Sequence, residues 1–460
     1  MTRLASTGRR FGLRTALLLM AVIAGLVPLW LSPASLLWAI VPVIVLAAIL
    51  WSNRAHGVVY SPVTLLAVGW LLPAMTTCFA PQWMLDGRTW MVILTSYLAF
   101  AAGYSIPVSV WLRKRKPQSR TGSVLQAWDK QRFRKALSVL FTLGMLGFGV
   151  NLANVWRHGG LPIYWHLEFR EVERIFAFHP LTNYLYFLNG LVLILGTAYV
   201  SCYGGTFSVL LQMIASFAAL FFHTVVGTVV FPTVIAIYAY WLLGRRFPVR
   251  MVVSLLLLAF LAFGIVSIGR RYVTPSEATP QEFVFFVARR MYRYMAPNFA
   301  NLRMELTHRV NHLWGAMTVA GPIVKLVSLS GRLPFARLAL PGTHLYLVDR
   351  LYNAGTYLRD FFVDFGLGGI LAGPFVLGLV TTLLFGQFRF NPTLRNALLY
   401  SIAVTMITFT FWFNEFTRIQ FWYFMAIIWL ADRLLIKRGQ AARMGMRPRR
   451  GFAPGPTVSQ

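Results

Sequence analysis

The sequence predicts an all-α polytopic integral membrane protein, and three observations lead to that fold class. The 460-residue chain is 57% hydrophobic and only 12% charged, and its mean hydropathy is +0.63. Its apolar runs are each long enough, at roughly 17 to 25 residues, to cross a bilayer as a helix. The net charge of +30 falls mostly in the short segments between those runs. This composition excludes a soluble globular domain.

About twelve transmembrane helices follow from these runs. The first is expected to be an uncleaved anchor, because apolar sequence resumes soon after Pro33. Two spans share one continuous run, which is divided near His223. The stretch 313–330 contains Gly, Pro and Lys and is expected as a re-entrant or surface helix. In chain order the expected spans are 13–31, 34–51, 60–79, 90–112, 136–156, 182–202, 204–222, 226–243, 250–269, 366–388, 396–412 and 419–436.

The basic residues set the expected orientation, since Lys and Arg are retained on the cytoplasmic side of a membrane. With both termini inside, the inner segments hold 26 of the 43 basic residues but only 2 of the 13 acids. Inner loops that face anionic lipid headgroups explain the net charge, so no nucleic-acid partner is expected. Residues 1–440 are expected as one membrane domain with outer loops 157–181 and 270–365, and residues 441–460 as a disordered basic cytoplasmic tail.

Polar residues line one side of a predicted helix near the end of the long outer loop. At about 100° per residue, the polar residues of segment 349–366 form a stripe and its apolar residues take the opposite side. Two interpretations stay open. The helix lies on the membrane surface with its polar face in water, or it lines a cavity and presents a carboxylate to a substrate. The stripe consists of Asn353, Thr356, Tyr357, Asp360 and Asp364.

Charge on the outer side gathers in the two long loops, which hold 9 of the 11 outer acids. In the first loop Arg170 and Arg174 share one face of a helix, although pairing with neighbouring Glu residues also explains them. The second loop opens with Arg270 and Arg271 at the end of a span. Further along, Arg290 falls on the apolar face of an expected helix, where it must snorkel, pair or meet an anion. A charged stripe beside that face consists of Glu282, Arg289 and Arg293.

The outer loops combine these arginines with interleaved aromatic residues. Guanidinium forks suit phosphate oxygens, and aromatic faces suit sugar rings or polyprenyl tails, so a sugar linked to a lipid pyrophosphate satisfies both. His308 and His312 are spaced i, i+4, but neither a zinc-protease Glu nor a third ligand accompanies them, and no metal site is expected. Cys78 and Cys202 indicate neither a disulfide framework nor a thiol metal site.

Three outer segments carry a family resemblance. The first is GGLPIYWHLEFREVER, the second is SIGRRY followed by MYRYMAPNFANL, and the third is YNAGTYLRDFFVDFGLGG. Together with the layout of the spans, they resemble the bacterial O-antigen and oligosaccharide repeat-unit polymerases of the Wzy type. The resemblance implies a glycosyltransferase of GT-C-like architecture in the bacterial inner membrane, with no cofactor and no metal.

Under this resemblance the substrate is an oligosaccharide repeat unit carried on undecaprenyl pyrophosphate at the outer face of the membrane. The growing chain moves from its lipid carrier to a sugar hydroxyl of a new lipid-linked repeat. A chain-length regulator and a flippase are implied as partners.

The chemistry of this transfer assigns roles to residues of the outer loops. Arg174 and Arg271 are expected to stabilise the charge that develops on the leaving pyrophosphate. Asp360 and Asp364 are expected to act as base or to hold the sugar. A histidine base stays open as an alternative, and its candidates are His166, His179 and His344. Further phosphate or sugar contacts are expected from Arg170, Arg270, Arg290, Arg293, Tyr294, Asn298, Asn353 and Tyr357.

Three other functions stay open. An O-antigen ligase has a similar layout and moves finished polymer to a lipid acceptor. A transporter or flippase of lipid-linked sugars also suits about twelve spans, but transporters usually carry mid-membrane ionisable residues and two related halves. A structural or assembly protein of the membrane, without catalysis, is the third.

Overall fold

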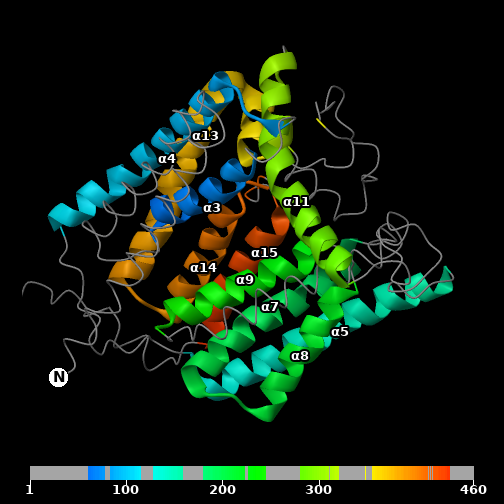
Figure 1. Cartoon of the computed structure of the whole chain (residues 1–460). Coiled ribbons are helices and arrows are strands. Elements are labelled where there is room, and N and C mark those ends of the chain that lie inside the picture. Colours follow the sequence, from blue (N-terminus) through cyan, green and yellow to red (C-terminus); the bar gives the residue numbers. More distant parts are fainter. Residues whose placement is uncertain are drawn as a thin grey trace, which may run out of the picture.

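The computed structural model describes residues 61–77, 83–114, 128–158, 180–222, 226–244, 280–309, 311–320, 348, 355–412, 414, 416 and 418–435. In these ranges the chain is helical, as expected, and its helices pack into one bundle (Figure 1). The helices are α3 (Pro62–Thr76), α4 (Gly87–Lys114), α5 (Lys130–Arg157), α7 (Pro180–Tyr203), α8 (Phe207–Phe221), α9 (Val226–Leu242), α11 (Pro280–His308), η4 (Ala316–Ala320), α13 (Tyr357–Phe390), α14 (Leu394–Thr408) and α15 (Ile419–Leu435).

Every predicted span within the described ranges has a helix at its position. Of the described helices, four are long and apolar enough to cross a membrane: Gly87–Val110, Lys130–Arg157, Leu181–Tyr203 and Tyr357–Phe390. Three shorter apolar helices accompany them, over Phe207–Phe221, Gly227–Leu242 and Leu394–Thr408. These helices indicate a protein embedded in a membrane. The predicted spans 13–31, 34–51 and 250–269 lie outside the described residues, as does the tail 441–460.

Polar contacts join α5, α14 and α15 at one end of the bundle. Trp128 Nε1 donates to Asp432 Oδ1 at 2.8 Å, and Arg395 Nη1 donates to Asp432 Oδ2 at 3.1 Å. The Asp129 carboxylate caps α5 by accepting from the N–H groups of residues 131 and 132, which stabilises the start of a helix. We call this the basic end, because Lys130, Arg132, Arg134, Lys135, Arg395 and Arg433 lie in these helices near it.

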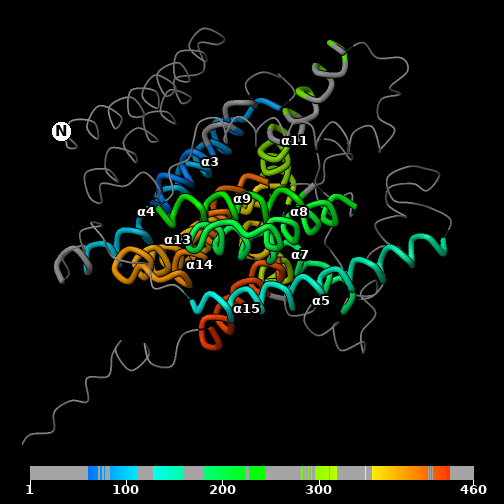
Figure 2. Tube along the Cα trace, turned by 90° about the horizontal axis from the view of Figure 1, so that it is seen from below, coloured from blue at the N-terminus to red at the C-terminus, as the bar shows by residue number. Residues whose placement is uncertain are grey.

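Two glycines let α4 and α13 approach closely. A Cβ atom on Gly103 would collide with the backbone at Phe375, and one on Gly378 would collide with the backbone at Phe100. Small residues permit such backbone contact between helices in membranes. The two helices run side by side in Figure 1, and Figure 2 shows α3 and α11 on one side of the bundle with α5 and α15 on the other.

The helix α13 consists of two pieces separated by a sharp break at Gly366. Its φ of 61° and ψ of −146° belong to a region that only glycine adopts readily. In a straight helix, Phe361 and Gly373 would be about 18 Å apart. Instead the Phe361 ring lies against Gly373, and its carbonyl group lies against Gly369. The short piece, 357–365, therefore turns back along the long piece.

This short helix is the described part of the predicted polar helix 349–366. It begins at Tyr357 with Thr356 as its N-cap, and residues 349–354 lie outside the described part. The predicted end at the glycine-rich sequence FGLGG agrees with the break at Gly366. Of the two open interpretations, the one that places the polar face in water does not hold for most of this helix, because Thr356, Tyr357 and Asp364 of the polar stripe are buried.

Candidate functional site

Buried and partly buried polar side chains gather where three elements meet: the C-terminal half of α11, the segment 311–320, and the short helix of α13. Charged groups are costly to bury in a membrane protein and are usually retained for a function or a partner. We call this cluster the polar junction. Its members are Asn298, Asn301, Glu305, Arg309, His312, Thr356, Arg359, Asp360 and Asp364.

The helix α11 supplies one side of the polar junction. Asn298, Asn301 and Glu305 are spaced i, i+3 and i+7, so they share one face, and all three are buried. Arg309 Nε donates to Glu305 Oε2 at 2.7 Å, with side-chain exposures of 5% and 0%. The Asn301 side-chain oxygen accepts from the backbone N–H of Val348 at 2.9 Å. The face is thus tied by hydrogen bonds that stay within the protein.

Arg359 lies in the first turn of α13 and is only 4% exposed. The charged groups that act on its guanidinium are Asp360, Glu305 and Arg309. A Cβ atom on Gly355 would lie 2.5 Å from Arg359 Nε, so the side chain reaches back over the residue four positions earlier. Helical side chains lean in this direction. The guanidinium therefore lies near the N-terminus of the short helix.

The start of the short helix is fixed deep in the bundle. The Tyr357 N–H donates to the Thr410 carbonyl at 2.8 Å, and Trp70 Nε1 donates to the Thr410 hydroxyl at 3.0 Å. The N-cap residue Thr356 is fully buried, yet its side chain makes no capping hydrogen bond and its hydroxyl oxygen has no hydrogen-bond partner among the described residues. A buried hydroxyl of this kind is uncommon in a folded protein.

Asp364 fastens the segment 311–320 to α13. Its carboxylate accepts hydrogen bonds from the Met317 N–H at 2.9 Å, the Thr318 N–H at 2.7 Å and the Thr318 hydroxyl at 2.6 Å. Its carbonyl accepts from the Trp314 N–H at 2.9 Å. Asp360, one turn earlier, is only partly buried. The two predicted carboxylates thus have different surroundings, and Asp360 is the one with access to solvent.

His312 packs against the break in α13. Its ring meets the Phe362 ring edge-on, with centroids 5.6 Å apart, and a Cβ atom on Gly366 would lie 2.8 Å from His312 Nε2. His308 does not point the same way, because its Nδ1 atom lies 2.9 Å from the Met304 carbonyl oxygen. Within the described ranges, no three His, Cys, Asp or Glu side chains are grouped so that they could hold a metal ion.

The structure brings together only part of the predicted site. Asn298, Asp360 and Asp364 belong to the polar junction, and Tyr357 borders it, fully buried with its ring edge-on to Trp70 at 5.3 Å. Whether they contact a substrate stays a prediction. Arg290, Arg293 and Tyr294 lie in α11, but their side chains are not described. Other predicted residues lie outside the described ranges: Arg170, Arg174, Arg270, Arg271, Asn353, His166, His179 and His344.

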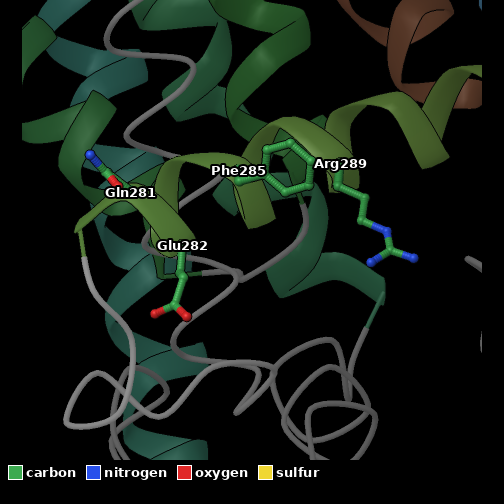
Figure 3. A pocket seen from close by; sticks show the side chains of 4 residues that line it. All are labelled: Gln281, Glu282, Phe285 and Arg289. Carbon is green, nitrogen blue, oxygen red and sulfur yellow. The ribbon is translucent and has the colours of Figure 1, made fainter.

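The N-terminal half of α11 presents a different surface. A hollow of about 430 Å³ is lined there by Gln281, Glu282, Phe285 and Arg289, and Figure 3 shows Glu282 and Arg289 on either side of Phe285 along the helix. Phe285 is 72% exposed. The predicted charged stripe is confirmed for Glu282 and Arg289, which are both exposed.

Sequence reasoning missed Asn301, Glu305, Arg309 and Arg359 as members of the site. The spacing of Asn298, Asn301 and Glu305 on one helical face is a signal that was present in the sequence. Arg359 carried no comparable signal, because its burial depends on the short helix turning back into the bundle.

Comparison with known proteins found no relative of this chain. No protein-family model matches the chain, and neither a curated protein nor a solved structure matches it. We therefore infer the function from the geometry of the polar junction and from the chemistry of its residues.

Proposed function

We propose that the chain is a membrane glycosyltransferase that polymerises lipid-linked oligosaccharide repeat units. It transfers the growing glycan from undecaprenyl pyrophosphate to a sugar hydroxyl of a new lipid-linked repeat at the outer face of the bacterial inner membrane. In this proposal the chain has about twelve spans in a GT-C-like arrangement, both termini are cytoplasmic, and a chain-length regulator and a flippase are its partners.

One observation carries the proposal: a charged, buried polar junction lies at the end of the bundle away from the basic end. The helix α14 links the two ends directly. Near its start Arg395 bonds to Asp432 at the basic end, and just beyond its last residue Thr410 bonds to Tyr357 beside the junction. Basic residues favour the cytoplasmic side. The junction then faces the outer side, where lipid-linked repeats are joined.

The residues of the polar junction suit the proposed transfer. The acceptor oxygen forms a bond to the anomeric carbon, the bond from that carbon to the phosphate oxygen breaks, and the pyrophosphate leaves with the electron pair. Asp360 is partly exposed and is our candidate to take the hydroxyl proton. A buried guanidinium such as Arg359 stabilises developing negative charge better than one in water.

The predicted loop residues keep their place in the proposal. Arg174 and Arg271 would stabilise the leaving pyrophosphate together with groups of the polar junction, and no metal or cofactor is required for that role. The hydrogen bonds that Asp364 accepts favour a positioning role for it over a proton-accepting role, because three donors already satisfy its carboxylate.

The test is the size distribution of surface and lipid-linked glycan in cells that lack the protein. Under the proposal single repeat units replace the ladder seen in the parent strain. Complementation with the wild-type gene or with an Arg289→Gln variant restores the ladder, and complementation with Asp360→Asn does not. Polymer that accumulates on its lipid carrier would identify a ligase instead.

A transporter of lipid-linked sugars is a second candidate, favoured by a specific observation. Glu305 and Arg309 form a buried ion pair, and buried ionisable residues are frequent in transport pathways. This function predicts that cells without the protein accumulate lipid-linked repeats at the cytoplasmic face. A polymerase predicts single repeats that have already reached the outer face.

A further inference from the structure

We infer that the N-terminus of the short helix of α13 is a binding site for a phosphate or diphosphate group, formed by Gly355, Thr356 and Arg359. The inference deepens the proposed function and depends on it for the identity of the ligand, the diphosphate of a lipid-linked sugar. Arg359 is not among the loop arginines that the sequence predicted as phosphate contacts.

The N-terminus of the short helix supports the inference. A helix N-terminus carries a partial positive charge, which favours a bound anion. The Tyr357 and Arg359 N–H groups already donate to the Thr410 and Thr356 carbonyl groups, so the attraction comes from the partial charge of the terminus. In the short helix this terminus lies inside the bundle, because Thr356, Tyr357 and Leu358 are all fully buried. Water weakens such an electrostatic contact at the surface, whereas a buried position strengthens it.

The hydroxyl of Thr356 lacks the hydrogen bond expected of an N-cap residue. An N-cap threonine normally accepts a hydrogen bond from the N–H group two or three positions later. Here the Thr356 side chain makes no such bond, and its oxygen is buried with no partner in the part of the chain that the structure describes. A phosphate oxygen would accept a hydrogen bond from this hydroxyl. The orphaned hydroxyl therefore points to a ligand that is an acceptor.

The guanidinium of Arg359 lies beside the same helix terminus. Arg359 reaches back over Gly355, where only glycine leaves room for it, and so its charge is added to that of the helix terminus. Guanidinium groups bind phosphate oxygens through two parallel hydrogen bonds.

The experiment measures diphosphate binding to the purified full-length protein in lipid nanodiscs by titration calorimetry. The probes are inorganic pyrophosphate and undecaprenyl diphosphate, with undecaprenol as the lipid control that lacks phosphate. Arg359→Gln is expected to weaken binding of both diphosphates about tenfold or more, and Thr356→Val several-fold. Thr356→Ser keeps the hydroxyl and is expected to bind within about twofold of wild type, as is Arg289→Gln on the exposed part of α11.

Unchanged binding in both Arg359→Gln and Thr356→Val would overturn the site. If Arg359→Gln does not yield folded protein, Thr356→Val decides, because valine has nearly the shape of threonine and removes only the hydroxyl. Equal affinity for the two probes indicates that the site recognises the anion alone, whereas tighter undecaprenyl diphosphate binding assigns it to the lipid carrier.

This result is separable from the proposed function. If the purified protein binds diphosphate in a way that depends on Arg359, but cells without the protein keep an unchanged glycan ladder, the binding site stands and the polymerase proposal falls. If cells without the protein lose the ladder, but the variants bind diphosphate as tightly as wild type, the polymerase proposal stands and the binding site falls.

Discussion

The carboxylate of Asp364 accepts hydrogen bonds from both the backbone N–H and the hydroxyl of Thr318, at 2.7 and 2.6 Å. This relationship joins two segments that are far apart in the sequence and holds the polar junction together from one side. It also separates the roles of the two carboxylates that lie one helical turn apart in α13.

We predict that Asp364→Ala destabilises the protein. The substitution leaves two backbone N–H groups and one hydroxyl without their acceptor, and loss of a hydrogen bond to a charged group costs about 1.5 to 3 kcal/mol. The measurement is the thermal unfolding temperature of purified protein in detergent. Thr318→Val removes one of the three donors and is expected to lower this temperature less. An unaltered unfolding temperature in Asp364→Ala would contradict the fastening role.

For Asp360 we predict a loss of activity without a loss of stability. Asp360→Asn removes the proposed base but keeps the size of a partly exposed side chain, so the unfolding temperature is expected to stay close to that of wild type. Glycan polymerisation is expected to fall about 100-fold or more, in the range typical for loss of a general base. Polymerisation at the wild-type rate would remove Asp360 from the mechanism, and a lowered unfolding temperature would show that its role is structural.

The break at Gly366 predicts a strong effect of a single methyl group. Gly366→Ala forces an L residue into φ 61° and ψ −146°, at a cost of about 1 to 3 kcal/mol, and its Cβ atom meets the His312 ring. Lower stability and lower activity are both expected. Gly368→Ala is the matched control, because a Cβ atom there meets nothing within 4 Å. Equal stability of the two variants would argue against the sharp turn.

The buried ion pair on α11 predicts an asymmetric response to mutation. Glu305→Gln leaves the Arg309 charge buried without its carboxylate, and breaking a buried pair from one side costs about 3 to 5 kcal/mol. Replacement of both residues, as Glu305→Gln with Arg309→Met, is expected to recover part of that loss. The comparison uses unfolding by denaturant of the two variants and wild type. A double variant less stable than Glu305→Gln would contradict this account.

Gly355 tests the position of the guanidinium without removing any functional group. Gly355→Ala places a methyl group 2.5 Å from Arg359 Nε, so the side chain must move away from the helix terminus. Diphosphate binding is expected to weaken several-fold while the Arg359 charge is retained. Binding equal to that of wild type would show that the guanidinium does not need this position.

Much of the helical layout could be predicted from the sequence, because apolar runs long enough to cross a bilayer are a strong signal. The predicted stripe of Tyr357, Asp360 and Asp364 was based on helical periodicity, and a helix is present there with a break at Gly366. Periodicity states which residues share a face. It does not state what that face packs against, so the burial of Asp364 could not be predicted.

The burial of Arg359 and Glu305 shows the same limit for α11 and α13. Both residues are charged, and charged residues are seldom buried unless they have partners. Arg359 lies near Glu305 and Arg309 of another element of the fold, and local sequence does not reveal that proximity. The pair of Glu305 and Arg309 had the i, i+4 spacing of a helical ion pair, but only the contact between α11 and the bundle makes that pair a buried one.

The measurement that tests the central claim most directly is polymerisation by the purified protein. Lipid-linked repeat units are isolated from cells that lack the protein and are added to the wild-type protein in nanodiscs. The account predicts glycans extended by whole repeats, with one undecaprenyl pyrophosphate released for each repeat added, and no extension with Asp360→Asn. Folded, monodisperse wild-type protein that extends no chain and releases no undecaprenyl pyrophosphate would contradict it.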